Sequence, residues 1–254
     1  AGTNIESWIK EVPSGWKVEE NVADFAQYGM EVPYASLGAA DYKVTYQASN
    51  GRAVYSFCMC PGGKVVAAAS EEGMVAVNGM SYLARDGENA NSALVVNVTP
   101  EDFDGTDVLA GVEFQRKWEQ AAYQLSGSYK APVQLVGDFL EGQMSTAFGE
   151  TRPSYRPGVV FCDLSQCLPG FVTESLREAI PAFGRKIKGF DREDAILTGI
   201  ETRTSSPVRI TRNEQYQSPT AKGLYPCGEG AGYAGGIMSA AVDGLNVALA
   251  ILRK

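Results

Sequence analysis

The chain has 254 residues, of which 44% are hydrophobic and 20% charged, and its formal net charge at pH 7 is −8. This length allows one large or two smaller domains with a sizeable core. Its apolar stretches are far shorter than the roughly 20 residues that span a bilayer, and no basic run would attract a nucleic-acid backbone. We therefore expect neither a membrane-spanning segment nor nucleic-acid binding.

The chain contains no histidine, and its five cysteines are scattered at Cys58, Cys60, Cys162, Cys167 and Cys227. A Ser-His-Asp triad, a Cys-His pair and a His-liganded metal are thereby excluded for this chain. An odd number of scattered cysteines does not make a disulfide framework in a chain of this length, so we expect a reducing cytoplasm. Acid–base chemistry near neutral pH would need perturbed carboxylates, cysteines or lysines, or would belong to a cofactor.

The first hundred residues predict mainly β structure after one short helix. That helix should run from Ile5 to Val12, where Pro13 ends it. Two β-rich runs between residues 42 and 60 flank Asn50-Gly51, the dipeptide that most strongly signals a hairpin. Further strands are expected at 64–70, 74–78 and 94–98. Together they predict an antiparallel small barrel or curled sheet.

Helical patterns dominate the next ninety residues. Helices are expected from Val112 to Leu125 and from Pro169 to Ile187, the second kinked or split at Pro181. The stretch 126–160 is rich in Gly, Ser and Pro and predicts loop with short strands. From residue 195 the pattern indicates strand, turn and strand to residue 213, a further strand at 223–228, and a helix from Gly235 to the end.

A glycine-rich turn joins that last predicted strand to the last helix, with a G-x-G-x-x-G at Gly230, Gly232 and Gly235. Such glycines let the backbone approach a ligand, and the helix start offers unpaired N–H groups to it. The same pattern also occurs where a strand and a helix merely pack closely. A nicotinamide-binding Rossmann unit is disfavoured, because its second strand cannot fit before Lys254. Glu229 in the turn favours a hydroxyl-bearing ligand over a phosphate.

Five blocks occur in this order along the chain: LGAADYK, VYSFCMCPGGKVVAAASEEGMVAVNGMSYLARDGENANSALVV, LPGFVTESLREAIPAFGRKIKGFDREDAIL, ETRTSSPVRI and GEGAGYAGGIMSAAVDG. Together they resemble the C-terminal half of bacterial FAD-dependent dehydrogenases, which are similar to the glutathione-reductase-like flavoproteins. The resemblance covers about residues 18–254 and implies that FAD is the cofactor of the intact protein. It also implies that an ADP-binding N-terminal half is absent here, so that this chain is an excised fragment, inactive alone.

The resemblance also implies a set of flavin-binding residues in the glycine turn. Glu229 would hydrogen-bond the ribityl chain, and backbone N–H groups near Gly236 and Ile237 would face the pyrimidine end of the flavin ring. The segments KVEENVADF and SYLARDG lack histidines expected in family members, which puts any chemistry of those histidines in doubt. The implied cofactor-binding residues are Gly228, Glu229, Gly230, Ala231, Gly232, Gly235, Gly236 and Ile237.

The resulting fold class is α+β, with an antiparallel, barrel-like β-rich part, a helical lobe and a partial α/β FAD-binding segment at the C-terminus. Residues 1–195 would form an inserted cap or substrate region, β-rich over 18–100 and helical over 101–190. Residues 196–254 would be the returning segment of the FAD-binding domain. The implied function is that of a fragment of an FAD-dependent oxidoreductase; a non-catalytic protein-binding module with an architectural glycine turn is the alternative.

Three further groups are candidates for the substrate region. Cys58 and Cys60 could form a dithiol relay, or half of a zinc site completed by Cys162 and Cys167. One residue between two cysteines is tight spacing for two ligands of one zinc ion, and we expect no metal. The plainer alternative is that both cysteines are buried small side chains in a strand. Arg85 and Asn91 belong to polar turns that could contact a substrate. A turn carrying Arg203, Thr204, Ser205 and Arg209 could hold a carboxylate or phosphate, or could be a solvated surface turn.

Overall fold

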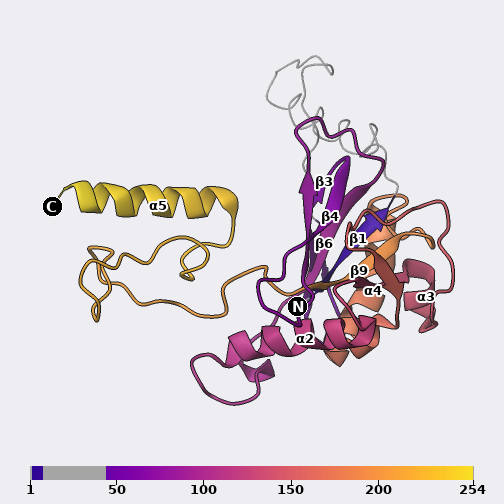
Figure 1. The fold of residues 1–254 in the computed structure, drawn as a ribbon, viewed down its shortest axis with the longest axis horizontal. Helices are drawn as coiled ribbons and strands as arrows, with labels where there is room; N and C mark the ends of the chain where they lie inside the picture. The colour runs from indigo at the N-terminus through magenta and orange to yellow at the C-terminus, as the bar shows by residue number, and fades with distance from the viewer. Residues whose placement is uncertain (1, 8–43, 254) are drawn as a thin grey trace. The chain divides into compact units, whose positions relative to one another are not determined.

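A computed structural model describes residues 2–7 and 44–253 of the chain (Figure 1). The strands are β1 (Gly2–Ser7), β2 (Val44–Gln47), β3 (Ala53–Cys60), β4 (Gly63–Ala67), β5 (Val77–Ser81), β6 (Ala90–Val96), β7 (Ala131–Leu135), β8 (Val159–Phe161) and β9 (Ile196–Glu201). The helices are α2 (Ala110–Ser126), α3 (Val136–Glu141), α4 (Gly170–Lys186) and α5 (Ile237–Leu252), with 3₁₀ turns η2 (Pro100–Asp102) and η3 (Leu164–Gln166). The α+β class is confirmed.

Within the described residues, the main sheet has seven strands in the order β2-β3-β6-β1-β9-β7-β8. Its pairs are antiparallel except β7 with β8. Among the described strands, β2 and β8 are the two edges of this curled sheet, so these strands do not close into a barrel. The remaining two strands, β4 and β5, form a separate antiparallel pair.

The predicted helix at residues 5–12 is wrong for its first three residues, which belong to β1; residues 8–12 lie outside the described residues. Strand β1 pairs with β6 on one side and β9 on the other. Ile5 is buried in the core of the sheet's helix-covered face. Pairing with two distant strands overrides the local helical pattern.

The predicted hairpin is confirmed. Strands β2 and β3 pair around a turn in which Gly51 has φ +81°, a conformation that favours glycine. Asn50 accepts the backbone N–H of Arg52 at 3.1 Å, and its amide contacts Ser175 of α4 at 3.0 Å. The turn is therefore fixed both locally and by the helix that packs on the sheet.

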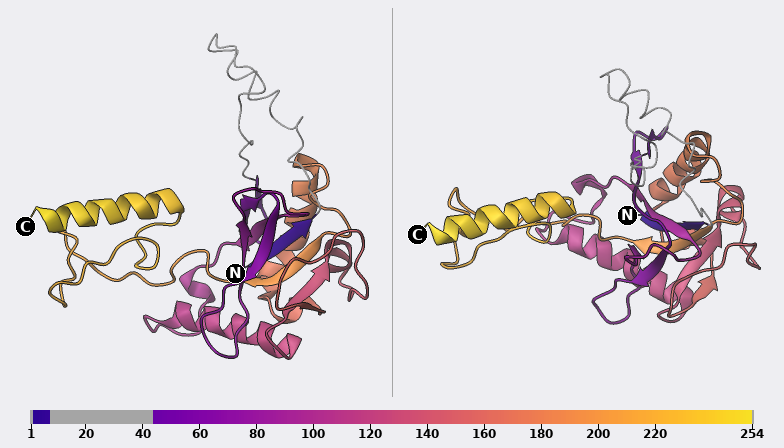
Figure 2. Two further views of the ribbon diagram at one scale, coloured as in Figure 1. Left: turned by 45° about the horizontal axis from the view of Figure 1, so that its top comes forward. Right: turned by 90° about the horizontal axis from the view of Figure 1, so that it is seen from above.

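One face of the main sheet is covered by helices α3 and α4 (Figures 1 and 2). Leu94 of β6 and Leu176 and Phe183 of α4 are fully buried in this core. Helix α4 continues through Pro181 to Lys186. Of the kink or split predicted there, the split is therefore wrong. The predicted helix at 112–125 is confirmed as α2, whereas α3 lies in a stretch predicted as loop with short strands.

Chain contacts divide the structure into two compact units. The first contains residues 1–97 and 118–202, and the second contains 98–117 and 203–254. The functional division expected between residues 195 and 196 stays a prediction. In the second unit, the strands predicted at 208–213 and 223–228 are wrong, because both stretches are irregular, whereas the final helix is confirmed as α5.

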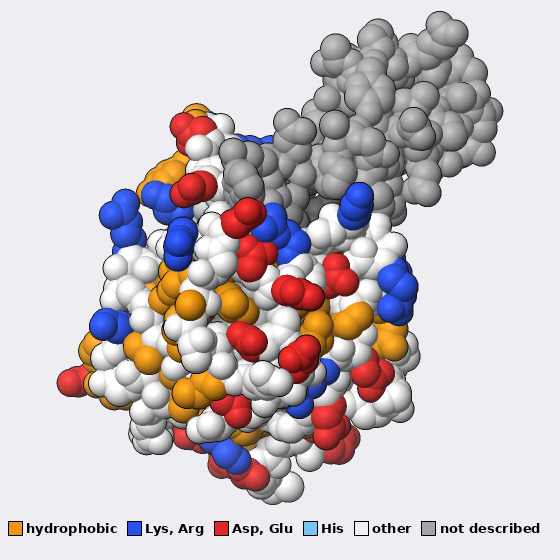
Figure 3. Space-filling view, turned by 90° about the vertical axis from the view of Figure 1, so that its right-hand side faces the viewer, with side chains coloured by type: hydrophobic (Ala, Val, Ile, Leu, Met, Phe, Trp, Pro, Cys, Tyr) orange, Lys and Arg blue, Asp and Glu red, His pale blue; other side chains and the backbone are white. Residues whose placement is uncertain are grey.

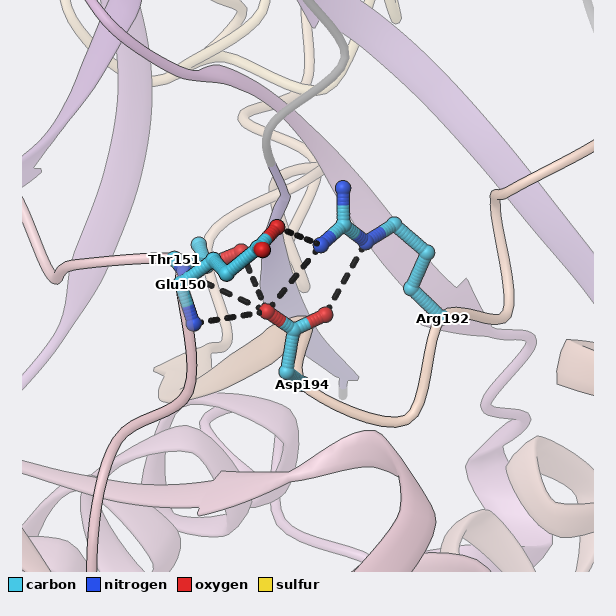
Figure 4. Close-up of polar contacts among 4 residues, drawn as sticks. All are labelled: Glu150, Thr151, Arg192 and Asp194. Atoms are coloured by element: carbon cyan, nitrogen blue, oxygen red, sulfur yellow. Dashed lines mark hydrogen bonds and ion pairs between the residues drawn. The ribbon is translucent and has the colours of Figure 1, made fainter.

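The Asp194 side chain links the loop that contains Arg192 to the loop that contains Glu150 and Thr151 (Figure 4). Its carboxylate accepts hydrogen bonds from the Arg192 side chain at 2.9 and 3.1 Å and from the backbone N–H groups of Glu150 and Thr151 at 3.0 and 3.2 Å. Arg192 also pairs with Glu150 at 3.2 Å. The three charged side chains of Glu150, Arg192 and Asp194 thus form a defined hydrogen-bonded network.

The molecular surface is mixed in charge on the face shown in Figure 3, where acidic and basic side chains are interspersed. None of the helices in residues 44–253 combines the length and apolar character needed to cross a membrane.

Candidate functional site

The glycine turn of residues 228–236 leads directly into α5. Gly228 and Gly232 have φ values of +72° and +79°, which L-amino acids with side chains rarely adopt. The Gly232 N–H donates to the Glu229 carbonyl at 2.8 Å, and the Tyr233 N–H donates to the Gly228 carbonyl at 3.0 Å. Gly228 and Gly232 are therefore needed for the backbone conformation of the turn itself.

The turn also packs closely on the preceding segment at one point. A Cβ at Gly232 would lie 2.5 Å from the Val208 carbonyl oxygen. Ala231 is buried, and its carbonyl accepts the Ile210 N–H at 3.1 Å. This part of the predicted cofactor-binding set has an architectural role in the chain.

Gly230 and Gly235 differ from these two glycines. Neither has a positive φ, and a Cβ at either position would have no atom of the described residues within 4 Å. Neither conformation nor packing within the described residues requires a glycine there. The turn thus keeps an open face where another molecule or chain segment could approach the backbone closely.

The first turn of α5 has free hydrogen-bonding capacity. Gly236 is its N-cap, with no side-chain capping bond and no acidic residue in the first turn. Ile237, the first helical residue, is 87% exposed. A helix start of this kind offers N–H groups and a positive dipole end to an electron-rich group.

Arg212 and Asp243 anchor the turn to the helix. The guanidinium binds both carboxylate oxygens, at 2.9 and 2.7 Å, and Asp243 also accepts the Gly228 N–H at 2.8 Å. Arg212 further donates to the Pro226 carbonyl at 2.8 Å and lies 3.6 Å from the centre of the Tyr233 ring. Sequence analysis missed both residues of this pair.

Arg209, a predicted substrate-binding residue, contacts the turn. Its Nε donates to the Gly232 carbonyl at 3.0 Å, and its guanidinium lies 5.0 Å from the Tyr233 ring centre. Ser206 donates to the carbonyls of Val208 and Gly230. The structure thus brings Arg209 to the glycine turn, and its proposed contact with a substrate stays a prediction.

The other members of that cluster follow β9 directly. Arg203 and Thr204 are half-buried, and Ser205 is exposed. The role of these three residues in binding an anion stays a prediction.

Cys58 and Cys60 lie at an irregularity near the end of β3. Cys58 is exposed with φ +53°, and its carbonyl accepts a hydrogen bond from the Cys60 thiol at 3.3 Å. Burial raises the pKa of Cys60, which opposes the thiolate character that a dithiol relay needs. Over residues 2–7 and 44–253, no three His, Cys, Asp or Glu side chains are grouped to hold a metal ion, so the zinc alternative has no geometric support.

Arg85 and Asn91 occupy contrasting environments. Arg85 is exposed and has φ +52°. Its carbonyl oxygen packs closely on Gly62, because a Cβ added to Gly62 would lie 2.1 Å from that oxygen. Asn91 is only 2% exposed and lies opposite Cys60 in the pairing of β6 with β3. Within residues 2–7 and 44–253, neither polar atom of its side chain has a hydrogen-bond partner, which is unusual for a buried amide.

Glu201, at the end of β9, is a buried acid that sequence analysis missed. It is 4% exposed, its Oε2 atom has no hydrogen-bond partner among the described residues, and burial raises its pKa to about 7. The Glu201 carboxylate also contributes to the raised pKa of Cys60. A sequence signal existed, since Glu201 is the sole charged residue of the strand ILTGIE.

The first unit thus contains the buried polar residues Asn91 and Glu201, and the second unit contains an open glycine turn at a helix start. Residues 15–204 match the family described as "FAD-dependent protein, C-terminal domain-like", and the chain belongs to this family. A protein of Clostridium beijerinckii, described as an uncharacterized protein, is 56% identical over 255 residues. That match covers 99% of this chain and 48% of the relative, so the chain spans about half the relative's length.

Proposed function

We propose that the chain is part of an FAD-dependent oxidoreductase, a dehydrogenase, in which residues 228–237 close the flavin site and residues 1–195 supply the substrate region. The open side of Gly230 and Gly235 carries this proposal. Membership in a family of FAD-dependent proteins supports the choice of FAD. The family match ends at residue 204, so the role of the turn rests on its own geometry.

The turn fits a flavin in three respects. Gly230 and Gly235 leave room for a ligand at the backbone. Glu229 is half-buried beside them and suits the hydroxyl groups of a ribityl chain. The uncapped start of α5 at Gly236 and Ile237 suits the pyrimidine end of the ring.

FAD, when bound, supplies the hydride-transfer chemistry. The residues of this chain would orient the ring and stabilise negative charge on it through the N–H groups and dipole of α5. The Arg212–Asp243 pair would hold the start of the turn in place for this purpose.

A second part of the protein would bind the ADP portion of FAD. Helix α5 exposes large apolar side chains that an additional protein segment could cover. The chain spans about half of its relative, which leaves room for such a segment. We propose that an N-terminal FAD-binding half packs on α5, and that this chain alone does not hold FAD usefully. The exposed residues of α5 are Ile237, Met238, Val242, Leu245, Leu249, Ile251 and Leu252.

Reconstitution of the intact protein tests the proposal. We expect FAD to bind and give a flavin absorbance spectrum, and Gly230→Ala and Gly235→Ala each to raise the FAD dissociation constant at least about tenfold. Gly170→Ala is a matched control, because Gly170 in the first unit also has open space and no positive φ. An intact protein that stays colourless with added FAD would overturn the proposal in favour of a non-catalytic binding module.

A further inference from the structure

A pocket of about 440 Å³ lies in the first unit, between the β4–β5 pair and the segment 154–157. It is separate from the glycine turn in sequence. Its residues fall within the proposed substrate region 1–195, but anion binding there requires no flavin. Its volume lies within the range of small-molecule sites. The lining residues are Lys64, Val65, Val66, Ala67, Met80, Ser81, Tyr82, Ser154, Arg156 and Pro157.

The walls of the pocket are mostly apolar and are fixed by a backbone contact. The Val65 N–H donates to Ser154 Oγ at 2.9 Å, which joins strand β4 to the 154–157 segment. Met80 and Tyr82 are 58% and 60% exposed. Exposed sulfur and aromatic surface beside a pocket favours an apolar ligand body.

The charged groups of the pocket are all positive. Lys64 and Arg156 line it, whereas no Asp or Glu does. Among residues 2–7 and 44–253, no carboxylate pairs with either cation; the Lys64 ammonium lies 4.9 Å from the centre of the Tyr82 ring. Two cations for which the described residues provide no counter-ion are notable on a chain with a net charge of −8.

These features together indicate the chemistry of a ligand. A Lys ammonium and an Arg guanidinium at one pocket favour an anionic group, which the guanidinium can bind through two hydrogen bonds. The apolar walls favour a small hydrocarbon or aromatic body attached to it. Ser81 offers a hydroxyl, although its Oγ already donates to the Pro61 carbonyl at 3.0 Å.

We infer that this pocket binds a small organic anion, with its anionic head group between Lys64 and Arg156 and its apolar body against Met80 and Tyr82. The ligand could carry a carboxylate or a phosphate, since both provide the same charge. The site needs no flavin, and its success or failure is independent of the FAD proposal.

Titration of the intact protein with phenylacetate, phenyl phosphate and the neutral phenylacetamide tests the inference, with saturation-transfer NMR as the readout. We expect at least one anion to bind about tenfold or more tightly than the amide. The two anions distinguish the head groups. Equal binding of all three probes, or no binding of either anion, would overturn the inference.

Substitutions then locate the binding. The Lys64→Gln/Arg156→Gln double variant should lose the preference for the anion, and Met80→Ala should weaken the binding of all three probes. Lys188→Gln removes one exposed positive charge outside the pocket and should leave the preference intact. If Lys188→Gln lowers anion binding as much as the double variant does, the anions bind through the positive charge of the protein in general and not through this pocket. That result would refute the proposed site. Unchanged thermal melting of each variant excludes loss of fold as the cause.

Discussion

Arg212 binds Asp243 through two parallel hydrogen bonds, although the two residues lie 31 positions apart. Both side chains are largely buried, at 11% and 14% exposure. The same carboxylate accepts the N–H of Gly228, the first residue of the glycine turn. The position of the turn on α5 therefore depends on one ion pair as well as on its glycines.

Asp243→Asn should loosen the turn, because Arg212 loses its charged partner. Hydrogen bonds to charged groups contribute about 1.5–3 kcal/mol each, so we expect the FAD dissociation constant of the intact protein to rise at least about tenfold. Quenching of flavin fluorescence measures it. Glu214→Gln, at an exposed position of the same segment, is the control and should bind FAD as the wild type does. Wild-type affinity of Asp243→Asn would show that the pair does not position the turn.

Gly232→Ala should destabilise the chain itself, unlike the same change at Gly230. The positive φ at Gly232 costs a residue with a side chain about 1–2 kcal/mol, and the new Cβ would lie 2.5 Å from the Val208 carbonyl. We expect a lower urea midpoint for Gly232→Ala and an unchanged midpoint for Gly230→Ala, in the absence of FAD. Equal midpoints for the two variants would contradict the distinction between architectural and open glycines.

Local signals explain what could be predicted from the sequence. The Asn50-Gly51 hairpin and helix α2 follow from turn chemistry and apolar spacing within short segments. Strand β1 could not be predicted in the same way, because its pairing with β6 and β9 depends on residues far along the chain.

In the candidate site, too, some residues could be predicted from local patterns and others depend on contacts between distant segments. The spacing of its glycines identified the turn, whereas Arg212 and Asp243 form their pair across 31 residues without any local motif. Asn91 was selected as a polar turn residue, but the pairing of β6 places it in the interior of the sheet. The positions of Arg212, Asp243 and Asn91 depend on tertiary contacts, and such contacts cannot be recognised in a single sequence.

Asp194→Asn should destabilise the fold at neutral pH and much less in acid. Burial raises the pKa of Asp194, but hydrogen bonds from Arg192, Thr151 and Glu150 outweigh this effect and hold the pKa below its ordinary value of 3.8. A lowered pKa stabilises the fold above pH 3.8, and this stabilisation is lost as the pH falls through the lowered value. We expect a loss of about 1–3 kcal/mol at pH 7. Urea unfolding at pH 7 and pH 3 measures it, and a difference that persists undiminished at pH 3 would contradict the network's ionic role.

The cysteines should react with maleimide in an order set by burial. Cys58 and Cys227 are exposed, whereas Cys162 and Cys167 are buried, and burial raises the pKa of Cys167 to about 12. Because the thiolate is the reacting form, we expect Cys58 and Cys227 to be labelled first and the buried pair only in denaturant. Mass spectrometry of peptides gives the order. Rapid labelling of Cys167 in the folded protein would contradict its burial.

Glu201 should make the fold less stable as the pH rises from 4.5 to 7. Burial raises the pKa of its carboxyl from 4.5 to about 7, so the unfolded chain ionises first and the folded chain keeps the proton. A raised pKa means that the stabilisation is complete below 4.5 and is lost as the pH rises through about 7; a shift of this size corresponds to about 3 kcal/mol. Glu201→Gln should remove this pH dependence, because the amide stays neutral.

Urea unfolding at pH 5 and pH 8 measures the effect. We expect Glu201→Gln to be more stable than the wild type at pH 8 and close to it at pH 5. Glu72→Gln removes one exposed carboxylate and controls for net charge. If the wild type and Glu201→Gln lose the same free energy of unfolding between the two pH values, Glu201 is ionised in the folded protein. The carboxyl would then have a partner or solvent access that the buried Oε2 atom lacks in this structure.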